Sequence, residues 1–262
     1  MLKDLTTLDF EILDRVATIR LNRPEAANGF NLTMASELAT VAQHCDLNSN
    51  VKAVLLSGNG RFFSAGGDVK AMAGAGSNVG QEVKRMADEL HRAISTFQRM
   101  NAPLVVAVNG TCAGAGFSLA LTGDIVVAAS SAKFTMAYTS IGLSPDGGST
   151  YFLPRLVGLR KAQELMFTNR TLTSEEALDW GLISAVVGDA DLPTAAADMA
   201  AKLANGSLMA NSAVKELLLT TFANPLETQM ELEGRRIAAA AASPNGHEGI
   251  RAFVQKRPAR FE

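Results

Sequence analysis

The stretch LVVAVNGTCAGAGFSLAL, residues 104–121, decides the fold class of this chain. Residues 104–108 are all apolar, as expected of a strand that is buried on both faces of a sheet. Glycines follow at positions 110, 114 and 116, and residues 115–121 then predict a short helix. A strand, a glycine loop and a helix in this order are typical of α/β proteins.

The same arrangement occurs earlier in the chain. The nearly continuous apolar segment 51–57 predicts another buried strand, and a glycine loop that includes residues 64–68, SAGGD, follows it. Further strands are predicted at residues 16–21 and 124–128. Apolar residues recur at helical spacing over residues 32–47 and 81–100. This alternation predicts an α/β core with parallel strand pairing.

The second half of the chain has the pattern of helices. Thr173 and Glu176 form a capping-box pattern before a helix that should end at Gly181. Pro193 and Pro244 stand where first-turn prolines are favoured, and a helix is also expected to begin near Ser149. We therefore predict a catalytic core over residues 1–190 and a helical oligomerisation region over residues 191–262.

Composition excludes several classes of protein. The 262 residues are 47% hydrophobic and 19% charged, which excludes a disordered chain. The 24 basic and 26 acidic residues nearly balance, so no nucleic-acid partner is expected. Cys45 and Cys112 cannot build a disulfide scaffold, and no segment reads as a signal peptide or a membrane span. A cytoplasmic protein without a membrane partner is expected.

Several catalytic motifs match only in part. Residues 130–133 fit S-x-x-K, but the companion motifs of that enzyme class are absent. Residues 116–120 nearly match a nucleophile elbow, yet Ser118 lies ten residues beyond the end of the strand at Val108. His44, His91 and His247 lack the spacing of metal ligands. Neither a serine hydrolase nor a metal site is expected.

The two glycine loops have a chemical interpretation and a structural one. Small residues let backbone N–H groups approach a ligand oxygen, and a helix N-terminus adds partial positive charge beside the second loop. Two converging N–H donors would form an oxyanion hole. The glycines would otherwise serve only to make turns, and spacing alone leaves the two interpretations equal.

A family resemblance decides between them. The chain resembles the crotonase (enoyl-CoA hydratase/isomerase) superfamily over nearly its whole length. The motifs that carry it are NRPE (22–25), FSAGGD (63–68), NGTCAGAG (109–116), GDI (123–125) through Phe134, IGLSPDGG (141–148), LVG (156–158) and FVQKR (253–257). The resemblance implies a spiral of ββα units with a helical C-terminal trimerisation region, and trimers that often pair as hexamers.

The resemblance also implies a substrate and its binding residues. It implies an acyl-CoA thioester, with coenzyme A as part of the substrate and no permanently bound cofactor. The thioester oxygen would accept hydrogen bonds from the backbone N–H groups of Gly67 and Ala115. The CoA contacts would fall at Ala26, Ala27, Ala65, Lys70 and Lys256, the last reaching a neighbouring subunit. The family often has lysine where this chain has Ala26, and Asp68 and Asp124 match acids that we interpret as structural.

The chain departs from the hydratase pattern at two positions. The family's hydratases use two glutamates, and Ser118 and Tyr138 occupy those positions here. Serine is no base without a partner, and tyrosine has an ordinary pKa of about 10. The two-carboxylate hydration mechanism is therefore not expected, and both residues should instead line the acyl pocket together with His91.

Asp146 is the remaining carboxylate candidate. Local chemistry alone favours a turn or cap residue, since Asp146 stands between proline and two glycines. The resemblance to ring 1,2-epoxyphenylacetyl-CoA isomerases and enoyl-CoA isomerases raises a functional interpretation, because their aspartate shuttles a proton from this position. A single acid/base suffices for such a shift. We therefore predict an isomerase of an enoyl- or ring-acyl-CoA.

Segments 164–172 and 179–182 also resemble 4-chlorobenzoyl-CoA dehalogenase. In that branch the aspartate is a nucleophile, and a histidine at the position of His91 activates water. Tyr138 stands where the dehalogenase has tryptophan, which weakens the match. His91 lies beside apolar residues, and we favour a packing role for it. A CoA-binding scaffold without chemistry is a third alternative, and RNA binding, known for one relative, ranks last.

Overall fold

A computed structural model describes residues 5–262 of the chain, and its centre is a mixed sheet. The strand order is β1-β2-β3-β5-β7-β10, and every pairing is parallel except β1 with β2. The sheet comprises β1 (Leu8–Leu13), β2 (Val16–Leu21), β3 (Ala53–Gly58), β5 (Leu104–Val108), β7 (Ile125–Ala129) and β10 (Ala185–Val187). The predicted parallel α/β core is confirmed.

A second, smaller sheet positions the two glycine loops. Its order is β4-β6-β8-β9, from β4 (Phe62–Ser64), β6 (Thr111–Ala113), β8 (Lys133–Thr135) and β9 (Leu172–Thr173). Each loop comes after one of the strands predicted at 51–57 and 104–108, and a short strand of this second sheet, which the sequence did not predict, lies in between. Because β4 and β6 are parallel neighbours, their carboxyl ends and the loops beyond them lie side by side.

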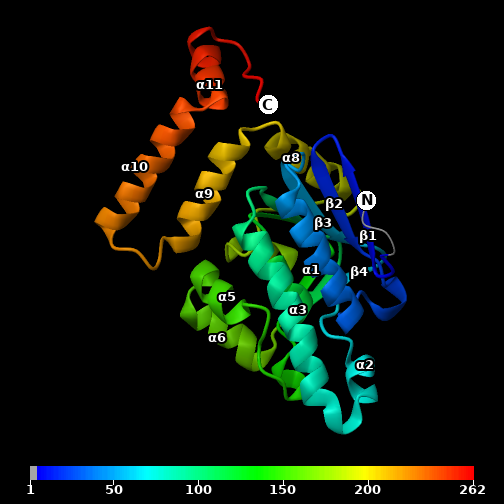
Figure 1. Ribbon diagram of the computed structural model, residues 1–262. Coiled ribbons are helices and arrows are strands. Elements are labelled where there is room, and N and C mark those ends of the chain that lie inside the picture. Colours follow the sequence, from blue (N-terminus) through cyan, green and yellow to red (C-terminus); the bar gives the residue numbers. More distant parts are fainter. Residues whose placement is uncertain (1–4) are drawn as a thin grey trace.

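Helices cover the large sheet (Figure 1). The predicted helix at residues 32–47 is α1 (Leu32–Leu47), and it packs against α3 (Val79–Arg99), predicted at residues 81–100. The remaining helices before the C-terminal region are α2 (Val69–Gly74), α4 (Ala115–Ala120), α5 (Ser149–Val157), α6 (Leu159–Thr168) and α7 (Ser174–Asp179). The capping box of Thr173 and Glu176 is confirmed at the start of α7.

Helix α8 (Leu192–Ala204) lies on the large sheet rather than apart from it. Its residues Leu192, Ala196 and Ala200 are buried, and the helix contacts β3, β5 and β7. Small alanines allow this close approach of helix to sheet. The division at residues 190 and 191 stays a prediction, but the tightly packed body extends through α8.

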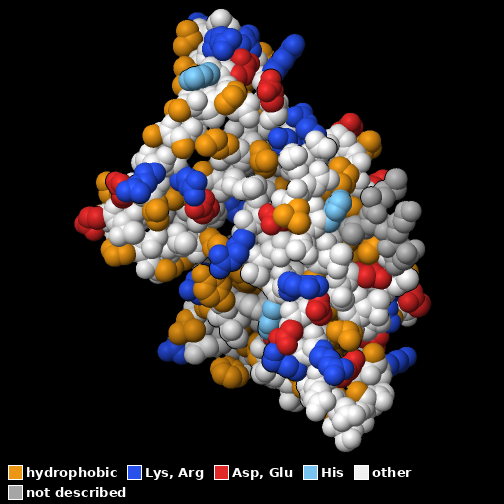
Figure 2. Space-filling view, viewed as in Figure 1, with side chains coloured by type: hydrophobic (Ala, Val, Ile, Leu, Met, Phe, Trp, Pro, Cys, Tyr) orange, Lys and Arg blue, Asp and Glu red, His pale blue; other side chains and the backbone are white. Residues whose placement is uncertain are grey.

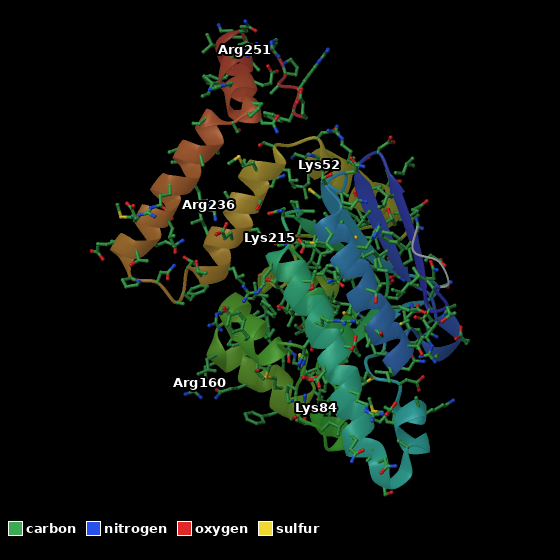
Figure 3. The ribbon with its side chains drawn as sticks, in the orientation of Figure 1. Lys52, Lys84, Arg160, Lys215, Arg236 and Arg251 are labelled. Carbon is green, nitrogen blue, oxygen red and sulfur yellow. The ribbon has the colours of Figure 1, made fainter. Side chains whose placement is uncertain are left out.

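The last three helices extend away from this body (Figure 1). They are α9 (Leu208–Thr220), α10 (Leu226–Ala242) and α11 (Pro244–Val254). Lys215 of α9, labelled in Figure 3, is bonded to the core through Asp124, with Nζ 2.7 Å from Oδ2. Among residues 5–262, no helix combines the length and the apolar character that a membrane crossing requires.

Candidate active site

The two glycine loops pack directly against each other. A Cβ added to Gly66 would lie 3.2 Å from the Ala115 nitrogen, and one on Gly116 would lie 2.6 Å from the Ser64 Cβ. Gly66 and Gly114 also have φ angles of +98° and +48°, in the region that disfavours side chains. These glycines are therefore needed for close approach and backbone conformation, so the structural interpretation holds for them.

The backbone N–H groups of Gly67 and Ala115 are different. Neither donates a hydrogen bond to any acceptor among residues 5–262. Phe30 bonds to the loop on either side of Gly67, accepting from the Asp68 N–H at 2.8 Å and donating to the Gly66 oxygen at 2.7 Å. Both N–H groups are therefore free to donate a hydrogen bond to an oxygen of a ligand.

Both residues line one apolar cavity, here called the main cavity, of about 370 Å³. Its walls come from the two loops, helices α2 and α3, and the segment from Ala137 to Asp146. Asp146 is the only carboxylate among its lining residues, and Lys84 of α3 is the only cation. Sequence reasoning missed Lys84, which is labelled in Figure 3. Its ammonium group forms an ion pair with Asp88. The cavity thus joins two N–H donors, one carboxylate and mostly apolar walls.

The Asp146 carboxylate is free of the cap role that its local sequence suggested. Gly148 is the N-cap of α5, and the Asp146 main-chain oxygen, not its carboxylate, accepts from the Ser149 hydroxyl at 2.9 Å. Gly147 has φ of +63° and lies against Ser118. The turn is therefore bonded through the backbone of Asp146, and Asp146 itself lines the main cavity.

The interpretation of His91 as a packing residue is wrong. Its side chain is 47% exposed, and its Nε2 lies 2.7 Å from Oδ1 of Asp146. His91 does not line the main cavity; it lines a neighbouring one, here called the side cavity, with Ser95 and Gln98 of α3 and Thr220 of α9. The two residues that the sequence separates by 55 positions form one acid–base pair.

Ser118 and Tyr138, at the positions of the hydratase glutamates, bond to each other. The two hydroxyl oxygens are 2.8 Å apart, and the Tyr138 hydroxyl donates to the Asp146 main-chain oxygen at 3.3 Å. Burial raises the pKa of Tyr138 above its ordinary value, with the Ser118 hydrogen bond opposing this effect. Tyr138 therefore stays protonated at neutral pH and is no base. Tyr138 lines the main cavity, whereas Ser118 lies buried behind it.

The residues expected to contact CoA do not all lie together. Ala65 lines the main cavity, and its N–H donates to the Ala27 oxygen at 2.9 Å, which places the turn of Ala26 and Ala27 beside it. Lys70 is exposed on α2. Lys256 follows α11, and Figure 3 shows Arg251 of that helix and Lys84 of the main cavity at opposite ends of the molecule. One chain alone does not bring Lys256 to this site.

The two acids that we interpreted as structural have structural partners. Asp68 caps α2 and lies 3.0 Å from the Arg23 guanidinium. Burial raises its pKa, but bonds from the Ala71 N–H and from Arg23 outweigh this and lower it. Asp124 accepts from the Leu104 N–H at 2.7 Å and pairs with Lys215. Within residues 5–262, no group of three or more potential ligands gathers as a metal site would.

Comparison with known proteins identifies relatives along the whole chain. The family model described as enoyl-CoA hydratase/isomerase matches residues 11–262. The chain is 38% identical to 1,2-epoxyphenylacetyl-CoA isomerase of Escherichia coli K12, over 94% of each chain. It is 39% identical to a probable enoyl-CoA hydratase of Rhodobacter capsulatus, over 97% of each.

A further relative and a solved structure extend this set. 4-chlorobenzoyl coenzyme A dehalogenase-2 of an Arthrobacter species is 31% identical, over 95% of this chain and 91% of that protein. A crystal structure of a putative enoyl-CoA hydratase from Streptomyces coelicolor superposes with a TM-score of 0.94 at 31% identity, over 100% of this chain and 96% of that one. The predicted crotonase fold and the resemblance to both branches are confirmed.

Proposed function

Because this chain belongs to the enoyl-CoA hydratase/isomerase family of acyl-CoA enzymes, we propose that it moves a double bond within an enoyl- or ring-acyl-CoA thioester. One observation carries the proposal. Asp146 is the only carboxylate that lines the main cavity, and the unpaired N–H groups of Gly67 and Ala115 lie on the same cavity. A single acid/base with an oxyanion site is the minimum that a proton shift requires.

The reaction follows from these groups. The thioester oxygen accepts hydrogen bonds from Gly67 and Ala115, which withdraw electrons from the carbonyl. The Asp146 carboxylate takes the proton next to the carbonyl, and the C–H electron pair moves into a dienolate whose negative oxygen the two donors stabilise. Asp146 then returns a proton to the far carbon of the conjugated system. The double bond has moved, and no oxidant, metal or cofactor takes part in the step.

Substitution of Asp146 tests the proposal. Asp146→Asn keeps the size of the side chain but removes the base, so isomerisation of 3-enoyl-CoA thioesters should fall by about 10²–10⁴. The measurement is the absorbance of the conjugated product, with deuterium exchange at the carbon next to the carbonyl. Glu89→Gln is the matched control, because Glu89 pairs with Arg92 on α3 away from both cavities. Full activity of Asp146→Asn on every thioester would exclude the proposal.

The His91 contact favours a second candidate, hydrolysis of an aryl-CoA with Asp146 as nucleophile. In this reaction the Asp146 carboxylate displaces a leaving group from the ring, and water activated by His91 cleaves the ester. A single turnover in ¹⁸O-labelled water separates the two reactions, since only the nucleophile route places the label in Asp146. A panel of 3-enoyl, ring-epoxide and halobenzoyl thioesters provides the substrates. Tight thioester binding without turnover or exchange would indicate a scaffold instead.

We also propose a homotrimer, alone or paired with a second trimer. Figure 2 shows hydrophobic side chains along α9–α11, and Phe222, Met230, Ile237 and Phe253 are all exposed in the single chain. Burial of this surface against neighbours would also bring Lys256 to the CoA of another subunit. Light scattering of the purified protein tests the assembly. The cytoplasmic location and the lack of nucleic-acid and membrane partners stay predictions.

A further inference from the structure

The Asp146–His91 pair lies between two cavities. Asp146 lines the main cavity and His91 does not, whereas His91 lines the side cavity and Asp146 does not. The side cavity, of about 530 Å³, lies between α3, the start of α5 and the end of α9. Part of its lining is polar, with Ser95, Gln98 and Thr220 beside His91. Polar walls of this kind are suited to binding water, whereas the mostly apolar main cavity is suited to an acyl group.

The imidazole ring of His91 can connect the two sides. Nε2 lies 2.7 Å from the Asp146 Oδ1, while Nδ1 has no hydrogen-bond partner among residues 5–262. The side chain is 47% exposed, so solvent reaches the ring. A neutral imidazole can accept a proton on one ring nitrogen and release a proton from the other.

We propose that His91 relays protons between Asp146 and water in the side cavity. This inference rests on the proposed function of Asp146. After Asp146 has taken the substrate proton, its carboxylic acid donates that proton to Nε2, and the imidazolium releases the proton on Nδ1 to water. The reverse sequence delivers a solvent proton to Asp146, so charge and protons balance in both directions. Through this relay the product acquires protons that come from water in the side cavity.

Isotope partition in D₂O tests the relay. During isomerisation by the unchanged enzyme, mass spectrometry should detect solvent deuterium in a large share of the product. His91→Gln retains a hydrogen-bond donor for Asp146 but cannot carry a proton. Deuterium incorporated per turnover should fall about tenfold, while the isomerisation rate falls much less, because Asp146 still shifts the substrate's own proton.

A second variant blocks the side cavity without changing the pair. Ser95 lies four residues after His91 on α3 and therefore on the same helix face. Ser95→Phe should fill the cavity beside the imidazole and lower deuterium incorporation several-fold. Arg85→Phe is the matched control, since it places the same ring on α3 at a 69% exposed side chain that lines neither cavity. Arg85→Phe should incorporate as much deuterium per turnover as the unchanged enzyme.

The outcomes separate the relay from the proposed function. In one outcome, the unchanged enzyme, His91→Gln and Ser95→Phe all isomerise the thioester and incorporate the same amount of deuterium. This result would overturn the relay and leave the proposed isomerase function intact. In another outcome, His91→Gln loses both isomerisation and deuterium exchange but has a normal thermal unfolding curve. This result would also overturn the relay, because His91 would then act in the proton shift itself. No isomerisation and no exchange with any thioester would overturn both proposals.

Discussion

Gly116 in α4 and Gly234 in α10 are both helical glycines, yet their surroundings are opposite. A Cβ on Gly116 would lie 2.6 Å from the Ser64 Cβ and 2.7 Å from the Ser64 oxygen, whereas nothing lies within 4 Å of one on Gly234. All residues of α4 are buried, and α10 buries none within the described chain. The two glycine loops complete their packing inside one chain, while the C-terminal helices leave apolar side chains exposed in the single chain.

The largest effect is expected at Gly116, the more tightly packed of these two glycines. Gly116→Val should cost about 3 kcal/mol of the free energy of unfolding or more, because the Ser64 main chain cannot move aside as a flexible side chain could. The Ala115 N–H would shift with the helix, so isomerisation should fall as well. Urea denaturation and the activity assay measure the two losses. Unchanged stability would show that the two loops can separate.

Gly234→Ala is the contrasting variant in the other region. Alanine is favoured over glycine in a helix interior by about 0.8–1.0 kcal/mol, and the position is open in the single chain. The variant should therefore raise the thermal midpoint. A lowered midpoint with loss of the assembly would instead show that a neighbouring subunit packs against Gly234, which would sharpen the difference between the two regions.

An intermediate effect is expected at the link between the regions. Lys215→Met keeps the length of the side chain but leaves Asp124 without its cation, 2.7 Å away. Breaking a fully buried ion pair lowers the free energy of unfolding by about 3–5 kcal/mol. Because the Asp124 side chain is 29% exposed, we expect a smaller loss of about 2 kcal/mol here. Urea denaturation of the variant and of Lys202→Met, a lysine on α8 outside the ion pair, measures the difference. Equal stabilities would mean that α9 is held by packing alone.

The smallest effect is a pH dependence of stability. Burial lowers the pKa of Lys215 below its ordinary 10.5, and Asp124 partly opposes this effect. Between the lowered folded pKa and 10.5 the unfolded chain binds more protons than the folded one. The free energy of unfolding should therefore rise with pH across that window. Denaturation curves in this range should show the rise in the unchanged protein and not in Lys215→Met.

Some of the fold was readable from local patterns, and one strand was missed despite its signal. The strands at 16–21 and 104–108 and the helix at 32–47 have the predicted bounds. In strand β1 the apolar residues Leu8, Phe10 and Ile12 alternate with acidic residues. This two-residue period was sufficient to predict a strand. The strands of the small sheet have only two or three residues, too few to show any period.

Some members of the candidate site could be predicted from the sequence, but their contacts could not. The resemblance singled out Asp146, Gly67 and Ala115, and these three do line one cavity. The hydrogen bond of His91 could not be read from its helix, because the neighbouring apolar residues suggested packing. The spacing of apolar residues indicates which face of a helix is buried. It does not indicate which residue of another segment will contact a side chain at the exposed edge of that face.

The sequence by itself determined the family, the α/β class and the identity of the candidate groups, because motif spacing and hydrophobic period are local properties of the chain. Only the tertiary structure decided which groups meet. The parallel pairing of β4 with β6 brings the two N–H donors together, and packing of α3 beside the turn before α5 places His91 against Asp146, 55 residues away. Such contacts depend on how segments that are distant in the sequence pack against each other, and a local sequence pattern carries no information about that packing.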